Sequence, residues 1–158
     1  MKRKLITLGI AILLLFSIAG LTACDDKDVG ISFQVSGDTF SFDGLDEQPV
    51  ITKLVKSMDE LNQLCDENGI GYEGEKYNEA YFEEKAIILR MYWLNVLASV
   101  HYDSVQIADD KIVINITSTK PKGNLPAQAI HYSDIIELSK SELQNATEIQ
   151  INTKNKTK

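Results

Sequence analysis

The segment KAIILRMYWL, residues 85–94, places the tightest constraint on the fold of this chain. It is a nearly continuous apolar run of about the length of one β-strand. A strand with one solvated face alternates apolar and polar residues, whereas an unbroken apolar run indicates burial on both faces. We therefore expect residues 85–94 to form a central strand of a sheet.

Several other segments alternate apolar and polar residues with the period of two that is typical of strands. Ser36-Gly37-Asp38 separates two such runs near the N-terminus, which predicts an N-terminal β-hairpin. Asp109-Asp110 separates two later runs and predicts a second hairpin. The alternating segments are 31–35, 40–42, 50–56, 99–108, 111–117, 127–139 and 147–153.

One clear helix is expected at about residues 57–67. Ser57 and Glu60 have the spacing of a capping box, in which the serine accepts a hydrogen bond from the first turn. Met58, Leu61, Leu64 and Cys65 then fall on one apolar face, and Gly69 and Gly71 end the helix. The segment YNEAYFEE predicts a shorter helix or turn. The fold class is α+β, with mostly antiparallel strands in one sheet and the main helix packed on a face.

The N-terminus has the pattern of an exported chain. The basic residues Lys2, Arg3 and Lys4 precede the uncharged run LITLGIAILLLFSIAGL, residues 5–21. A spanning helix needs about 20 apolar residues, so this run is marginally short for a membrane span. An uncleaved N-terminal anchor remains the alternative to a signal peptide.

The residues Leu21-Thr22-Ala23-Cys24 close this run and resemble the lipobox of bacterial lipoprotein signal peptides. The resemblance implies that residues 1–23 are removed and that Cys24 becomes the new N-terminus. It also implies a diacylglycerol-derived anchor on the Cys24 sulfur, carrying fatty acyl chains such as palmitate. Two acyl chains suffice for stable membrane attachment, whereas one is marginal. We therefore expect a lipid-anchored protein on the extracytoplasmic face of the cell membrane.

This assignment sets the domain organisation and the charge. We expect a short acidic linker at 24–29, a single extracytoplasmic domain at 30–153 and a disordered basic tail at 154–158. The net charge of the chain is −7, and removal of the three basic residues in 1–23 leaves −10. A body this acidic is a poor partner for nucleic acid, which requires clustered lysine and arginine.

The body of the chain also resembles a group of proteins. A helix with S-x-x-E-L, the step Y-x-x-x-Y-F-E-E-K-x-I into the central strand, and a late strand ending IIELSKSEL are similar to small extracytoplasmic lipoprotein domains of Firmicutes. Residues 50–152 are also loosely similar to the C-terminal domain of PrcB-type protease-complex proteins. The Gly-Gly-aromatic segment of that domain is replaced here by WLNVLASVHY.

Both histidines of the chain occur beside tyrosine, in HYDS at 101–104 and HYSD at 131–134. Contiguous residues of a strand point to opposite faces, so neither group can form a Ser-His-Asp triad alone. If the two strands were sheet neighbours, His101 and His131 could approach each other and hold a metal weakly. We favour two half-exposed strand histidines, and we regard His101, Tyr102, His131 and Tyr132 as a candidate ligand surface.

Other candidate chemistry is weaker. Cys65 falls on the apolar face of the expected helix, where a thiol behaves as a small hydrophobe and not as a nucleophile. The loop DENGIGYEGEKY begins like a calcium loop, but it has Ile70 and Tyr77 where carboxylates are needed. Aromatic residues are frequent, and we expect most of them to be structural. These residues are Tyr72, Tyr77, Tyr81, Phe82, Tyr92, Trp93 and Tyr102.

The sequence therefore predicts a membrane-anchored lipoprotein with a non-catalytic domain that binds a protein or small ligand outside the cell. We expect no cofactor, no metal, no catalytic residue and no nucleic-acid partner. Two alternatives stay open. One is an accessory or inhibitory subunit of a surface protease or transporter. The other is a hydrolytic or metal-dependent enzyme built on His101 and His131.

Overall fold

The computed structural model describes residues 29–37, 40–42, 50–95, 97–123 and 129–158. The expected signal peptide, Cys24 and all of the expected linker except Val29 lie outside these residues. In the described part of the chain, no helix combines the length and the apolar character needed to cross a bilayer.

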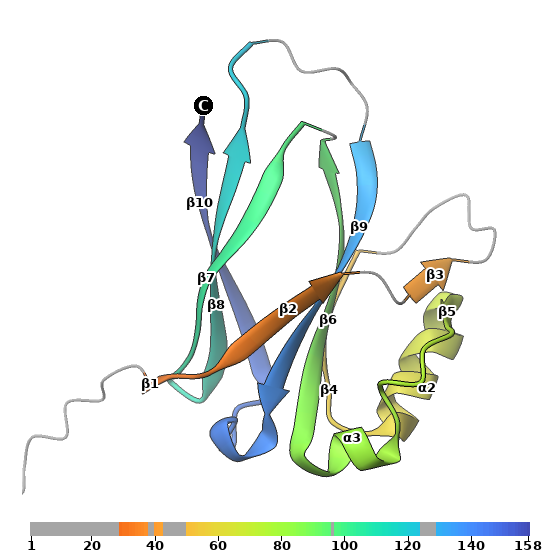
Figure 1. Cartoon of the computed structure of the whole chain (residues 1–158). Coiled ribbons are helices and arrows are strands. Elements are labelled where there is room, and N and C mark those ends of the chain that lie inside the picture. The colour runs from red at the N-terminus through yellow and green to blue at the C-terminus, as the bar shows by residue number, and fades with distance from the viewer. Residues whose placement is uncertain (1–28, 38–39, 43–49, 96, 124–128) are drawn as a thin grey trace, which may run out of the picture.

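The fold has three layers, two of which are four-stranded sheets (Figure 1). We call β1-β7-β8-β10 the outer sheet and β2-β9-β6-β4 the central sheet, each in its spatial order. The outer sheet contains β1 (Val29–Gly30), β7 (Ser99–Ala108), β8 (Lys111–Lys120) and β10 (Glu148–Thr157). The central sheet contains β2 (Phe33–Gly37), β9 (Ala129–Ser139), β6 (Lys85–Asn95) and β4 (Ile51–Val55).

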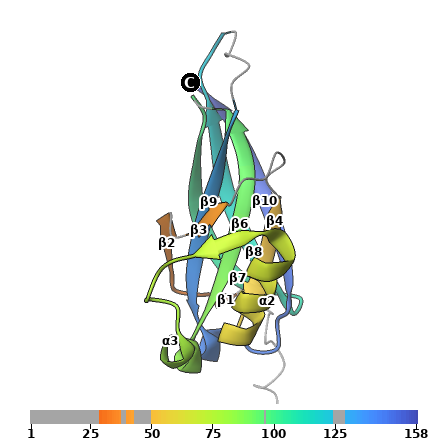
Figure 2. The same cartoon turned by 90° about the vertical axis from the view of Figure 1, so that its right-hand side faces the viewer.

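The third layer packs on the far side of the central sheet, and it faces the viewer in Figure 2. We call it the helical layer. It contains α2 (Met58–Asn68), α3 (Glu79–Glu84) and the small sheet of β3 (Phe40–Phe42) and β5 (Ile70–Tyr72). A single 3-10 turn, η1 (Lys140–Glu142), connects β9 to the segment before β10.

Strand β6 occupies the position that its apolar run predicts. It pairs with β9 on one side and with β4 on the other, so it is central. Ala86 and Ile88 pack in the core between the two sheets, whereas Ile87, Leu89 and Met91 pack in the core under the helical layer. All five side chains are fully buried, which explains why the run shows no alternation.

The α+β class, the mostly antiparallel pairing and the main helix are confirmed. Ser57 caps α2 by accepting a hydrogen bond of 3.1 Å from the backbone N–H of Glu60. Gly69 ends the helix in the left-handed conformation, with φ of 61°. Asp109 and Asp110 also have positive φ and form the tight turn of the β7–β8 hairpin, as expected.

The expectation of one sheet requires correction, because the strands divide between two. The chain leaves the central sheet at the end of β6 and enters the outer sheet with β7. The two N-terminal strands likewise belong to different sheets: β2 pairs with β9 in the central sheet, and β3 pairs with β5 in the helical layer. Alternation along one segment shows that a strand exists, but it carries no information about which strand pairs with it.

The expectation of a disordered tail at 154–158 also requires correction. Residues Lys154–Thr157 continue β10, which pairs in parallel with β8 along its whole length. This segment is exposed and polar, so its strand has no hydrophobic signature in the sequence. The backbone ladder with Thr117–Lys120 holds it in place.

Candidate functional site

The candidate site begins where the apolar pattern between the two sheets stops. On β6 and β9, the directly opposed pair Ile88 and Ile136 is fully buried in the core between the sheets. Two residues further along, the opposed pair is Arg90 and Asp134, and the next pair is Tyr92 and Tyr132. Because side chains alternate along a strand, all of these pairs face the outer sheet.

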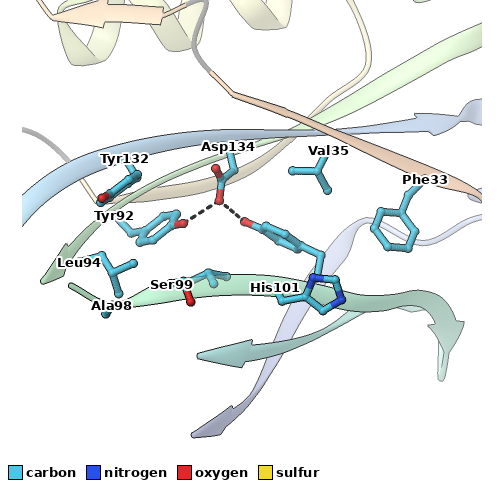
Figure 3. A pocket seen from close by; sticks show the side chains of 11 residues that line it. Phe33, Val35, Tyr92, Leu94, Ala98, Ser99, His101, Tyr132 and Asp134 are labelled. Carbon is cyan, nitrogen blue, oxygen red and sulfur yellow. Dashed lines mark hydrogen bonds between the residues drawn. The ribbon is translucent and has the colours of Figure 1, made fainter. Parts of the chain in front are cut away.

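Tyr102, on β7 of the outer sheet, reaches across to this block. Its hydroxyl donates a hydrogen bond of 2.6 Å to Oδ2 of Asp134, and it accepts one of 3.0 Å from Nη1 of Arg90. Tyr92 donates a second hydrogen bond, of 2.7 Å, to the same Oδ2 of Asp134. The two tyrosine–aspartate bonds converge on one carboxylate oxygen (Figure 3), so a polar network joins the sheets.

The electrostatics of this network keep its tyrosines protonated. Burial, followed by the hydrogen bond to Asp134, raises the pKa of Tyr92 and of Tyr102 far above the usual tyrosine range. Both hydroxyls therefore stay donors at any physiological pH. The Arg90 guanidinium lies 3.9 Å from the centre of the Tyr92 ring, close enough for a cation–π interaction.

A pocket of about 480 Å³ opens beside the network, between the two sheets. Ligand pockets span roughly 300–1,000 Å³, so the volume suits a small molecule. Strand β2 pairs with β9 at the edge of the central sheet (Figure 1), and it contributes Phe33 and Val35 to the wall. The lining residues come from four strands and from the turn before β7: Phe33, Val35, Tyr92, Leu94, Ala98, Ser99, Val100, His101, Tyr102, Tyr132 and Asp134.

The structure separates the four residues of the predicted ligand surface. His101, Tyr102 and Tyr132 line the pocket. His131 lies on the other face of β9, where its ring packs edge-on against Trp93 at a centroid distance of 5.2 Å. His101 is mostly exposed, and its nearest carboxylate oxygen belongs to Asp103, at 3.9 Å.

The two histidines do not meet the condition that a shared metal site would require. His101 is on β7 of the outer sheet and His131 is on β9 of the central sheet, so their strands are not neighbours. Within the described ranges, no group of three or more histidine, cysteine, aspartate or glutamate residues could hold a metal ion.

Cys65 is buried in the core under the helical layer. Burial, and to a lesser degree the nearby Asp66 charge, raises the pKa of the Cys65 thiol. A thiol with a raised pKa is a poor nucleophile, because the thiolate is the reactive form.

The loop that begins like a calcium site has a structural role. Tyr77 is buried, and its hydroxyl donates a hydrogen bond of 3.0 Å to Oε1 of Glu137. Ser36 donates to the same oxygen over 3.2 Å, and the ammonium of Lys76 forms an ion pair with it. Tyr81 donates to Oε2 over 3.3 Å. These bonds attach the 73–78 loop and α3 to the central sheet.

Sequence reasoning missed Arg90 and Asp134, the two charged members of the inter-sheet network. Apart from Lys85 at its start, the run 85–94 has one charged residue, Arg90. A charge inside a strand that is buried on both faces requires a partner. That charge was the available signal. Asp134 has no comparable local signal, because its hydrogen-bond partners come from β6 and β7.

In comparisons with known proteins, no family model, no curated protein and no solved structure matches this chain. The geometry described above is therefore the basis for a functional assignment.

Proposed function

We propose that the chain is a lipoprotein, lipid-anchored through Cys24 on the extracytoplasmic face of the cell membrane, whose domain binds a small ligand without catalysis. The observation that supports ligand binding is the inter-sheet pocket of about 480 Å³. Its walls are mainly aromatic and aliphatic, and they contain a few placed polar groups. Binding sites for small molecules have this composition.

The position of the pocket fits an anchored protein. Strand β1, the first described element after the proposed anchor, pairs with Ile107 and Gln106 near the end of β7. The pocket is lined by Ser99–Tyr102, at the beginning of the same strand. An extended chain covers at most about 3.6 Å per residue, so the four residues between Cys24 and Val29 would hold β1 close to the membrane. The pocket would then lie toward the end of the domain that faces away from the membrane.

Ligand-observed NMR with a library of small aromatic and aliphatic fragments tests this function. The full chain, purified in a non-ionic detergent, is compared with Val35→Trp, which places a large ring at an exposed position of the pocket wall. We expect a set of fragments to bind the wild type and to lose binding in Val35→Trp. Val50→Trp is the matched control, because Val50 is exposed and does not line the pocket. Fragment binding that Val35→Trp leaves intact, or no binding at all, would overturn the function.

A second candidate, the accessory subunit of a surface protease or transporter, is supported by an exposed apolar end. Trp93 and Ile130 lie near the paired ends of β6 and β9, and Leu97 follows in the turn to β7. All three side chains are exposed. Exposed apolar groups that cluster at one end are a feature of protein-binding surfaces. Affinity capture from intact cells with wild type and Trp93→Ser tests it: a stoichiometric partner should be lost in the variant.

A further inference from the structure

We propose that the ligand of the inter-sheet pocket is a small organic ammonium ion with an apolar body. This inference rests on the proposed function, since it names the chemical class that the pocket recognises. Three features carry it: the single carboxylate in the wall, the aromatic faces around that carboxylate, and the charge of the whole domain.

The carboxylate is Asp134, which among the described residues is the only acidic one that lines the pocket, and no described lysine or arginine lines it. Both tyrosine hydrogen bonds go to Oδ2, so neither of them occupies Oδ1. Arg90 is opposite Asp134 on β6, yet its guanidinium lies against the Tyr92 ring and donates to the Tyr102 hydroxyl. The charged side chain that the described wall presents to a ligand is therefore the Asp134 carboxylate, whereas Arg90, held against the Tyr92 ring, is not a lining residue.

The aromatic faces suit a cation. Tyr92 and Tyr132 stack with a centroid distance of 5.9 Å and an angle of 21° between ring planes, and both line the pocket. The face of an aromatic ring carries negative charge and attracts ammonium groups. The contact of 3.9 Å between Arg90 and the Tyr92 ring shows that this cluster already uses the interaction once.

The remaining walls select the body of the ligand. Val35, Leu94, Ala98 and Val100 are aliphatic, and Phe33 adds an aromatic ring. An anionic ligand would meet Asp134 without a compensating charge in the wall. A neutral ligand would cover the carboxylate without supplying an opposite charge, which costs free energy. An ammonium group both pairs the carboxylate and leaves the apolar walls for its substituent.

The charge of the domain adds a long-range contribution. Residues 24–158 carry a net charge of −10, the −7 of the chain less the three positive charges near its start. A strongly negative protein concentrates cations around it and speeds their association. This effect weakens with ionic strength, whereas the contact with Asp134 inside the pocket is screened less.

The test uses three probes that share one phenyl body: 2-phenylethylammonium, neutral 2-phenylethanol and anionic 3-phenylpropanoate. Their dissociation constants are measured by titration calorimetry with the full chain in a non-ionic detergent at 0.15 M salt. We expect the cation to bind at least about tenfold more tightly than the alcohol, and the anion more weakly than both. Val35→Trp should abolish binding of the cation, which locates it in this pocket.

The matched variants are Asp134→Asn and Asp110→Asn. Each removes one negative charge, but Asp110 lies in the β7–β8 turn, at the other end of β7 from the pocket. We expect Asp134→Asn to weaken cation binding by about tenfold or more and to leave alcohol binding unchanged. Asp110→Asn should change neither. Should Asp134→Asn fail to fold, the comparison of the three probes on the wild type still tests whether the pocket prefers a cation.

The outcomes separate the two proposals. If the alcohol or the anion binds as tightly as the cation and Val35→Trp abolishes that binding, the ligand class is wrong and the binding function stands. If the cation binds equally well to Val35→Trp, the cation does not use this pocket and the inference is overturned. If no probe binds, the inference is overturned, and the fragment library decides the function.

Discussion

Beside the pocket, Tyr102 joins the two sheets through its hydroxyl group. Its hydroxyl bonds both Asp134 and Arg90 on the central sheet, from a strand of the outer sheet. Arg90 and Asp134 are half-buried, and withdrawing charged groups from water is costly unless their hydrogen bonds are made. The Tyr102 hydroxyl therefore replaces hydrogen bonds to water that Arg90 and Asp134 lose between the sheets, which apolar side chains could not do.

We expect Tyr102→Phe to destabilise the domain by about 1–3 kcal/mol, because it leaves a carboxylate and a guanidinium each short of a hydrogen bond. Denaturant unfolding followed by circular dichroism measures the effect. Tyr132→Phe is the control, since it removes a hydroxyl from the same block and keeps the stacking on Tyr92. Equal stability of Tyr102→Phe and wild type would show that the network contributes nothing.

Glu137 makes the stability of the domain depend on pH. Burial by itself would raise the pKa of Glu137, but the hydrogen bonds from Lys76 and Tyr77 outweigh it, and the net pKa is lowered. A group with a lowered pKa in the folded state stabilises the protein above its unfolded pKa of about 4.3, and this contribution is lost as the pH falls. The Glu137 carboxylate thus holds the 73–78 loop most firmly at neutral pH.

We expect Glu137→Gln to lose stability at pH 7 and to show a shallower fall of stability than wild type below pH of about 5. Thermal unfolding from about pH 3 to about pH 7, a range that spans the titration of carboxyl groups, measures the difference. Glu84→Gln, at the exposed end of α3, is the control and should follow the wild-type profile. Parallel profiles for wild type and Glu137→Gln would contradict the role of this carboxylate.

At the scale of elements, β10 shows how a strand can form without a hydrophobic pattern. Its last residues, Lys154–Thr157, are exposed and polar, yet they pair with Thr117–Lys120 of β8. Thr117 and Ser118 are themselves buried. The C-terminal segment therefore covers polar backbone of β8 that would otherwise form an open edge.

We expect deletion of residues 154–158 to increase hydrogen exchange at the amides of β8 between Thr117 and Lys120. Loss of the backbone ladder is the physical reason, because those amides then lie on a sheet edge. The double variant Lys154→Ala, Lys156→Ala is the control, since it removes the charges and keeps the backbone. If both variants exchange like wild type, the segment does not protect β8.

At the scale of the whole molecule, the proposed anchor would orient the domain relative to the membrane. The N-terminal end of the described domain lies at β1, and the pocket lies toward the opposite end of β7. A ligand in the aqueous phase would then reach the pocket without approaching the bilayer. The orientation depends on Cys24, which is therefore the residue to test.

We expect Cys24→Ala to leave the precursor unprocessed and without its lipid, as the resemblance to a lipobox implies. Mass spectrometry of the N-terminal peptide in wild type should show cleavage before Cys24 and the added acyl chains. Cell fractionation should show less Cys24→Ala than wild type in the membrane. A variant that stays uncleaved in the membrane at the wild-type level, together with an uncleaved wild type, would favour an N-terminal membrane span.

The sequence by itself determined most of the segments that form strands and helices, although it did not reveal β5 or the end of β10. The unbroken apolar run of 85–94 predicted a doubly buried central strand, and the Ser57–Glu60 spacing predicted the start of α2. These features depend on residues close together in the chain, so local patterns suffice. The same patterns placed Cys65 in the core.

Only the tertiary structure decided how the strands divide into two sheets and which side chains meet between them. Arg90, Tyr102 and Asp134 come from three strands, and nothing in their local sequence specifies that β7 crosses to the outer sheet. Strand pairing is set by packing of whole faces, and alternation along one strand is compatible with many partners. The pocket is a property of that packing, so it became visible only when both sheets were in place.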